Sequence, residues 1–196
     1  MNQNLLKKKV IKVAARCFQE YGIKNTTMNF ISQMLHISKR TLYQLFPSKN
    51  ELLKACISFR LEANKKQIKE KCNMPNPVDA IIRMNCEAYA FTRTFYLAFR
   101  KDIQNFPDVI QLFEKEYSDP LFKLCSELLE QAKDMKLIQS ESDSELIFQF
   151  FKKNLLELPS GNVSRQKEIY KNTIRTYMAG ICTVEGREQL NMFYQK

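Results

Sequence analysis

Two short helical patterns joined by a tight corner, between residues 26 and 46, constrain the fold of this chain more than any other feature. Ile31 and Met34 lie three positions apart and give the first pattern one apolar ridge. Thr26 or Thr27 can cap its start, because a threonine hydroxyl accepts a hydrogen bond from a free amide of the first turn. A short capped helix is therefore expected at the beginning of this stretch.

The second helical pattern follows a corner at residues 35–37 and presents only polar side chains to solvent. Ser38 can cap a helix at Lys39–Leu45, and Leu42 and Phe46 face inward at a spacing of four residues. The outward side chains are cations, a hydroxyl, a phenol and an amide, which suit phosphates and base edges. They are Lys39, Arg40, Thr41, Tyr43 and Gln44. The stretch is interpreted as a helix-turn-helix with Lys39–Leu45 as its recognition helix.

Several motifs in order along the first quarter of the chain resemble the TetR-type transcriptional regulators. They are Tyr21-Gly22, Thr26-Thr27, Ile31, and IS-K-x-TLY-x-x-F-x-S-K-x-E-L from Ile37 to Leu52. His36 departs from the pattern, since the family usually has glycine at this corner. The turn needs a left-handed backbone, which histidine tolerates better than most residues, so modest strain is expected and not a lost fold.

Positive charge is concentrated in the same part of the chain as the motif. Residues 1–71 hold 15 Lys and Arg against 4 Asp and Glu, a net charge of +11, whereas residues 72–196 hold 16 against 17. A basic module attached to a neutral one suggests a polyanionic partner for the first module. A solvated basic face would explain a charge run alone. Its coincidence with the motif favours double-stranded DNA.

Composition favours an all-α, cytoplasmic protein with no catalytic residue, cofactor or metal. No apolar run approaches the ~20 residues that cross a bilayer, so no membrane partner is expected. Lys12 and Arg16 interrupt the apolar segment that a signal peptide would need. The six cysteines form no CxxC pair and lie in helical patterns, which favours buried reduced thiols over disulfides. With His36 as the one histidine, neither a zinc site nor an enzyme is expected.

Two domains are predicted, with about nine to ten helices in total. Residues 1–48 form a three-helix DNA-binding domain, and residues 49–196 form a C-terminal dimerisation and ligand-binding domain. A capping box at Ser48–Glu51 opens a long connecting helix at about 49–72. Further helices are expected at about 78–105, 107–117, 121–135, 146–158 and 165–181, followed by a short tail interrupted at Gly186.

The resemblance assigns DNA-contacting roles to residues of the motif. Lys39, Arg40, Thr41 and Gln44 would meet base edges or nearby phosphates. Thr27, Ser38, Tyr43 and Lys49 would fix the register through phosphates. Lys49 also carries a residue-level argument, because a cation at a helix N-terminus is unfavourable to the helix dipole unless an anion uses it.

The C-terminal part has two expected roles, dimerisation and ligand binding, which the resemblance implies. Two helices within residues 146–181 carry apolar faces wider than one core requires, so a homodimer is favoured over a buried hairpin. The expected interface residues are Phe150, Phe151, Leu155, Ile174, Tyr177 and Met178. A pocket for an apolar or amphipathic ligand could be lined by residues that would equally serve as plain core. They are Met84, Tyr89, Phe95, Phe99, Phe113, Tyr117, Phe122 and Phe148.

The predicted function is that of a TetR-type transcriptional regulator that represses by binding a palindromic operator as a homodimer and is released by a small apolar ligand. Two alternatives remain open at this point. One is a ligand-independent or nonspecific DNA-binding protein. The other is a helical interaction protein that no longer binds DNA, for which His36 is the one hint.

Overall fold

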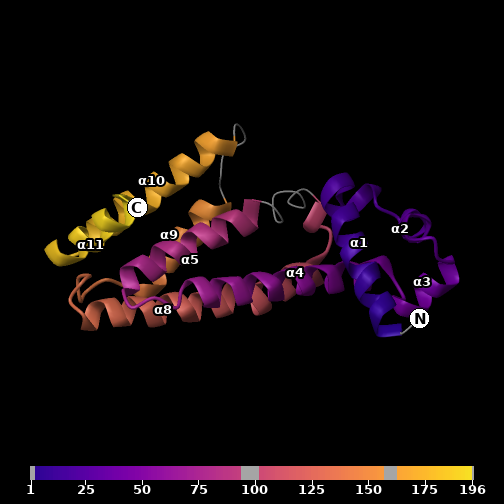
Figure 1. Ribbon diagram of the computed structural model, residues 1–196, viewed down its shortest axis with the longest axis horizontal. Coiled ribbons are helices and arrows are strands. Elements are labelled where there is room, and N and C mark those ends of the chain that lie inside the picture. The colour runs from indigo at the N-terminus through magenta and orange to yellow at the C-terminus, as the bar shows by residue number, and fades with distance from the viewer. Residues whose placement is uncertain (1–2, 94–101, 157–162, 196) are drawn as a thin grey trace. The chain divides into compact units, whose positions relative to one another are not determined.

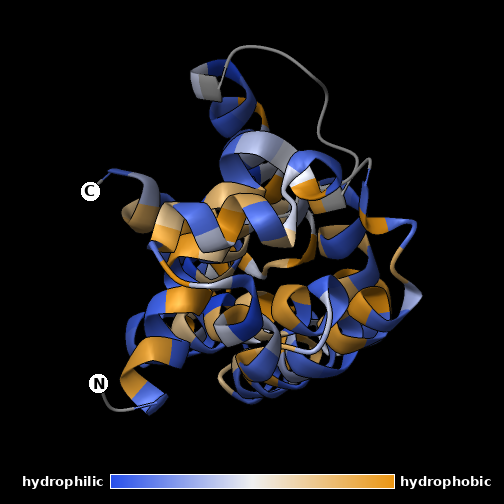
Figure 2. Ribbon diagram, turned by 90° about the vertical axis from the view of Figure 1, so that its right-hand side faces the viewer, coloured by the Kyte–Doolittle hydropathy of each residue, from blue (hydrophilic) through white to orange (hydrophobic). Residues whose placement is uncertain are grey.

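The chain is described by a computed structural model, which covers residues 3–93, 102–156 and 163–195. Within these ranges the regular structure is helical, apart from an isolated antiparallel bridge between Ile138 and Cys182. The all-α prediction is confirmed. Phe95 and Phe99, two of the expected ligand residues, lie outside the described residues. In Figure 2 hydrophilic and hydrophobic residues alternate along the helices, as two-faced packing requires.

Packing divides the chain into two compact units, each built from two separate segments of sequence. Unit 1 contains residues 1–64 and 93–118, and unit 2 contains residues 65–92 and 119–196. This division by packing differs from the predicted functional boundary between residues 48 and 49. That boundary concerns which segment contacts DNA, and it stays a prediction.

Unit 1 begins with α1 (Gln3–Asn25), whose helical course breaks at Gly22. The φ of +80° at Gly22 is a conformation that glycine adopts without the cost of a Cβ clash. Thr26 is fully buried beyond this break, and its hydroxyl lies 2.8 Å from the carbonyl oxygen of Gly22. Val10, Ala14 and Phe18 are fully buried on the inner face of α1. The first helix is thus anchored at its apolar stripe and closed by a defined turn.

Three further helices complete the N-terminal part of unit 1. They are α2 (Met28–Leu35), α3 (Lys39–Leu45) and α4 (Lys49–Lys71), of which α4 continues into unit 2 (Figure 1). The bounds of α3 and α4 agree with the predicted helices. The predicted apolar ridge of α2 is wrong in part, because Met34 is 43% exposed while Ile31 and Leu35 are buried. In a helix of eight residues, the buried face is completed at Leu35, one residue beyond Met34.

Unit 1 also contains a distant segment, residues 102–118, with α7 (Pro107–Phe113) and the π-helical turn η2 (Glu114–Ser118). Its Asp102 carboxylate accepts a hydrogen bond of 3.0 Å from the backbone N–H of Lys24. Its Asp108 carboxylate lies 3.1 Å from the Lys54 ammonium on α4. Hydrogen bonds to Asp108, and then to Glu51, raise the pKa of Lys54. Two carboxylates therefore attach this segment to the first four helices.

Unit 2 packs five helices together with the end of α4. They are α5 (Pro77–Phe91), α8 (Asp119–Asp134), α9 (Ser144–Leu156), α10 (Val163–Ile181) and α11 (Val184–Gln195). Asn76 caps α5 as expected, since its side chain accepts from the backbone N–H of Val78 at 2.9 Å. Asp143 caps α9 by accepting from the N–H of Leu146.

Two buried polar groups of α5 are paired within unit 2. Glu87 is 9% exposed, and its carboxylate lies 2.8 Å from the Lys71 ammonium, which offsets the cost of removing that charge from water. The Tyr170 hydroxyl donates to Asn85 at 3.1 Å, and its ring stacks on Tyr89 at 4.7 Å. The contacts of Tyr170 join α5 to α10.

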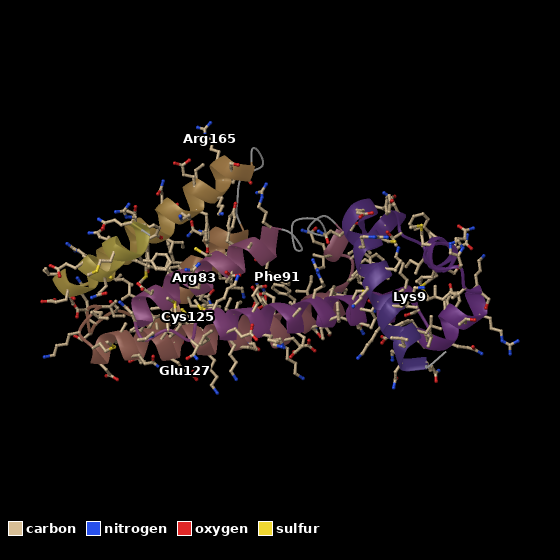
Figure 3. The ribbon with its side chains drawn as sticks, viewed as in Figure 1. Lys9, Arg83, Phe91, Cys125, Glu127 and Arg165 are labelled. Atoms are coloured by element: carbon tan, nitrogen blue, oxygen red, sulfur yellow. The ribbon has the colours of Figure 1, made fainter. Side chains whose placement is uncertain are left out.

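The cysteines are all free, in agreement with the prediction of reduced thiols. Five are buried and Cys86 is half-buried. Burial raises the pKa of Cys125 (labelled in Figure 3) to about 12, which keeps this thiol protonated at neutral pH.

Gly186 does not interrupt the last helix, which contradicts the expected break. A Cβ at this position would lie 1.8 Å from the Leu137 carbonyl oxygen, so α11 approaches the backbone after α8 too closely for any side chain. The glycine is a packing site within a continuous helix. Among the described residues, no helix is long and apolar enough to cross a membrane.

Candidate nucleic-acid interface

The interface is built on the start of α2, where Thr27 is the N-cap. Its backbone is extended, with φ of −98° and ψ of 158°, and its hydroxyl accepts from the N–H of Phe30 at 3.1 Å. Of the two threonines considered, Thr27 therefore caps the helix and Thr26 is buried in the core. Thr27 itself is exposed, so its hydroxyl proton faces solvent and can reach a phosphate.

The corner between α2 and α3 is formed by His36 in the left-handed conformation, with φ of 53° and ψ of 42°. Its backbone N–H donates to Gln33 O at 3.1 Å, and the N–H of Ile37 donates to Ser32 O at 3.0 Å. These two bonds satisfy the last carbonyls of α2 as a glycine corner would. The expected left-handed turn is present, and histidine occupies it with α2 and α3 both formed.

Ser38 is the N-cap of α3, as expected. Its side chain accepts from the N–H of Thr41 at 3.0 Å, and the two hydroxyl oxygens of Ser38 and Thr41 lie 2.8 Å apart. Either hydroxyl can donate in that pair. If Thr41 donates, the Ser38 proton remains available for a phosphate oxygen, so the two residues offer one donor between them.

The recognition helix α3 is held to unit 1 by one side. Leu42 is fully buried and Phe46, which ends the helix, is 4% exposed. Lys39, Arg40, Tyr43 and Gln44 are exposed, and Thr41 is half-buried. α3 therefore presents a guanidinium, an ammonium, a phenol and an amide outward, the donors and acceptors that contact phosphates and base edges.

Lys49 opens α4 beside the turn that follows the Gly22 break. Its ammonium donates to the Lys24 carbonyl oxygen at 3.4 Å. Burial lowers the pKa of Lys49, and the negative charge of Asp102 opposes this change. The ammonium is thus held near backbone and carboxylate oxygens at the surface of unit 1, where a phosphate oxygen could replace them.

The expected ligand residues that the structure describes are divided between the two units. In unit 2, Met84 and Tyr89 are buried on α5, and the rings of Phe122 and Phe148 lie 5.1 Å apart. In unit 1, the rings of Phe113 and Tyr117 lie 5.0 Å apart. Their role in ligand binding stays a prediction.

The expected dimer residues fall into two groups in the single chain. Phe151, Leu155, Ile174 and Met178 are buried within unit 2. Phe150 and Tyr177 are half-buried and stack at 3.9 Å, between α9 and α10. Exposed apolar residues on the same helices are Leu146, at 67%, and Ile169, at 45%, which the sequence prediction did not include.

Sequence reasoning also missed the two carboxylates that contact the N-terminal helices. Asp102 and Asp108 lie 78 and 54 positions from their partners Lys24 and Lys54. No periodic pattern connects residues at such separations. The Pro107 helix start is the one local signal in this segment, and it indicates no partner.

Comparison with known proteins agrees with this geometry. Residues 10–56 match the family model of bacterial regulatory proteins, tetR family. Over 64 residues the chain is 30% identical to YhgD of Bacillus subtilis (strain 168), an HTH-type transcriptional regulator. That match covers 33% of this chain and spans about a third, 34%, of YhgD.

Solved structures share the fold along most of the chain. The ketosteroid transcriptional regulator KstR2 of Mycobacterium tuberculosis is 17% identical, with a TM-score of 0.61 over 90% of this chain and 95% of KstR2. A transcriptional regulator from Saccharomonospora viridis in complex with choline is 12% identical, with a TM-score of 0.78 over 92% of this chain and 99% of that chain.

The N-terminal helices thus define a helix-turn-helix protein. Residues 10–56 are similar to the tetR family of bacterial regulatory proteins, in agreement with the resemblance seen in the sequence. The fold along most of the chain is that of solved transcriptional regulators.

Proposed function

We propose that this protein is a cytoplasmic repressor that binds a palindromic DNA operator as a homodimer. The observation that carries the proposal is the outward face of α3, which is polar and cationic while Leu42 anchors the opposite side in the core. Such a face can enter a major groove without disturbing the fold that holds it. Arg40 and Gln44 would contact base edges, with Lys39 and Thr41 at edges or nearby phosphates.

Phosphate contacts would fix the position of α3 on the duplex. Thr27, Ser38 and Tyr43 offer hydroxyl groups around α3, and Lys49 offers an ammonium at the start of α4. Hydrogen bonds from these groups to phosphates carry no sequence information but set the register in which base contacts form. The proposal therefore separates residues that set affinity from residues that set sequence preference.

A homodimer is supported by the two-sided packing of α9 and α10. On α10, Gln166, Tyr170, Ile174 and Met178 are buried at helical spacing in unit 2. Ile169, which is 45% exposed, is turned away from this stripe. Half-buried Tyr177 lies at the edge of the stripe and stacks on Phe150 of α9. Exposed apolar side chains on two adjacent helices suit a helical interface with a second copy. Two copies would bring two recognition helices to a palindrome.

A small apolar or amphipathic ligand is proposed to release the protein from DNA. KstR2 is named a ketosteroid regulator, and the Saccharomonospora viridis protein is in complex with choline. Buried aromatic residues of unit 2, including Tyr89 and Phe148, would supply the apolar contacts. The ligand can lower operator affinity by no more than its differential affinity for the two conformations.

The test is selection of random duplexes by the purified protein, followed by measurement of affinity against salt. A recovered palindrome that is bound much more tightly than bulk DNA, with a steep salt dependence, is the expected result. Strong binding without sequence preference would assign the protein to nonspecific DNA binding. Absence of binding to any duplex, after unfolding and refolding to remove a bound ligand, would overturn the proposal.

A further inference from the structure

The N-terminal half of α1 carries positive charge that the proposed DNA contacts do not use. Within Gln3–Asn25 there are five Lys and Arg before Gly22 and one Glu. Arg16 is within reach of that carboxylate, at 3.9 Å from Glu20. Among the described residues, no carboxylate forms a salt bridge with the three consecutive lysines 7, 8 and 9, which are all exposed. The matched family segment begins at residue 10, after these lysines.

Lys7 differs from its neighbours because it lies against the end of the recognition helix. Its ammonium is 5.4 Å from the centroid of the Phe46 ring. Phe46 is the residue at which α3 ends, and it is 4% exposed. The contact places the Lys7 ammonium over the ring of a buried residue at the end of α3, while Lys7 itself remains exposed. In Figure 1 this end of α1 lies next to α3.

Helical spacing explains why Lys7 has this position and Lys9 does not. Lys7 precedes the buried residues Val10 and Ala14 by three and seven positions, so it continues the inner stripe of α1. Two residues of α-helix turn the side chain by about 200°. Lys9, which is labelled in Figure 3, is therefore directed to nearly the opposite side of the same helix.

We propose that Lys7 binds a DNA phosphate adjacent to the groove that α3 enters, and so extends the phosphate contacts of this protein beyond the residues of the helix-turn-helix. The inference rests on the proposed DNA-binding function. Lys7 offers an exposed ammonium that lies against a buried ring, next to a helix with a cationic face. Among the described residues, no carboxylate forms a salt bridge with it. A phosphodiester oxygen is the ligand that this arrangement fits.

The test compares Lys7→Gln with Lys9→Gln in the full-length protein. Both variants remove one positive charge from exposed positions of the same helix, so they change net charge equally. Affinity is measured against salt on the selected operator and on an unrelated duplex. Lys7→Gln is expected to weaken both complexes by the same factor and to reduce the salt slope by about 0.9 for each phosphate that is no longer neutralised, or about 1.8 for a dimer. Lys9→Gln should leave the slope unchanged.

A further pair of variants distinguishes a phosphate contact from support of α3 through Phe46. Lys7→Arg keeps the positive charge, so it should preserve the salt slope. Lys7→Met keeps the apolar stem but removes the charge, so it should reduce the salt slope as Lys7→Gln does. Equal slopes for Lys7→Gln and Lys9→Gln would overturn the inference, as would a change of preferred sequence in Lys7→Met. Because the unrelated duplex is measured as well, these outcomes are separate from failure of the wild-type protein to prefer a palindrome.

Discussion

α3 in unit 1 and α10 in unit 2 both present a face that their own unit leaves uncovered, and the chemistry of the two faces is opposite. α3 presents Lys39, Arg40 and Gln44. α10 presents Ile169, which is 45% exposed. Both helices are anchored by fully or nearly fully buried side chains on the other side, Leu42 and Ile174. Both helices are therefore held in place in the same way, by a buried side chain on the inner face. The outward side chains of α3 suit DNA, whereas the outward side chain of α10 suits an apolar protein surface.

The largest effect is expected where the anchor of α3 is removed. Leu42→Ala should lower the free energy of unfolding by about 2–5 kcal/mol, because truncation of a fully buried leucine leaves a cavity. Urea denaturation of the purified variant measures this loss. The neighbouring Tyr43→Ala, at a side chain that is 48% exposed, should stay within about 0.5 kcal/mol of wild type. Similar losses for the two variants would contradict the packing of α3.

The exposed apolar surface on α9 and α10 of unit 2 can be changed by substitution without disturbing the core. Leu146→Glu introduces a charge on α9 at a side chain that is 67% exposed, and Val184→Glu does the same on α11 at 69%. If α9 and α10 form the dimer interface, Leu146→Glu should raise the dimer dissociation constant by about a hundredfold or more, because an unpaired buried charge costs several kcal/mol. Sedimentation velocity measures the shift. A dimer that resists Leu146→Glu, or that Val184→Glu disrupts equally, would place the interface elsewhere.

The proposed DNA-contacting residues of α3 and α4 can be divided into those that set the affinity for DNA and those that set the preferred base sequence. Arg40→Ala should cost about 1–3 kcal/mol on the preferred sequence and relax the preference at one position. Lys49→Ala should weaken binding to all sequences and reduce the salt slope by about 1 for each copy. Competition binding with single-base variants of the operator tests both. Normal operator binding by Lys49→Ala together with Tyr43→Phe would show that the phosphate roles are wrongly assigned.

The smallest effect is expected at the corner between α2 and α3. His36→Gly relieves a left-handed backbone but adds freedom to the unfolded chain, so the free energy of unfolding should rise by less than about 1 kcal/mol. His36→Val should lower it, since a β-branched side chain is poorly tolerated at a φ of 53°. Thermal unfolding of both variants measures the difference. A stabilising His36→Val would mean that the corner relaxes away from the left-handed conformation.

Sequence patterns predict the helix-turn-helix closely because its determinants are local. Ser38 caps α3, and the Glu51 N–H donates to Ser48 at the start of α4, so both helices begin where the sequence predicts. Met34 is predicted on the wrong face because a helix of eight residues has too few turns for its periodicity to select one. The DNA-contact roles themselves remain predictions from chemistry and resemblance.

Features set by distant contacts could not be predicted. Gly186 suggests a helix break in the sequence, yet glycine is required there because the Leu137 carbonyl oxygen lies 1.8 Å from where a Cβ would be. Four of the six expected dimer residues are buried in their own unit, since an apolar helical face does not reveal whether it meets the same chain or another. Leu146 and Ile169, outside the expected set, carry exposed apolar surface on these helices.

The attachment of residues 102–118 to unit 1 has a consequence for the order of events during synthesis. The segment up to residue 64 leaves the ribosome first, and Asp102 follows 38 residues later, which takes roughly 2–8 s at typical elongation rates. During this interval the backbone N–H of Lys24 and the ammonium of Lys54 lack their carboxylate partners from residues 102 and 108. The nascent DNA-binding helices therefore reach their final packing only after unit 2 has begun to emerge. A recombinant fragment that ends at residue 64 would keep this unfinished state permanently.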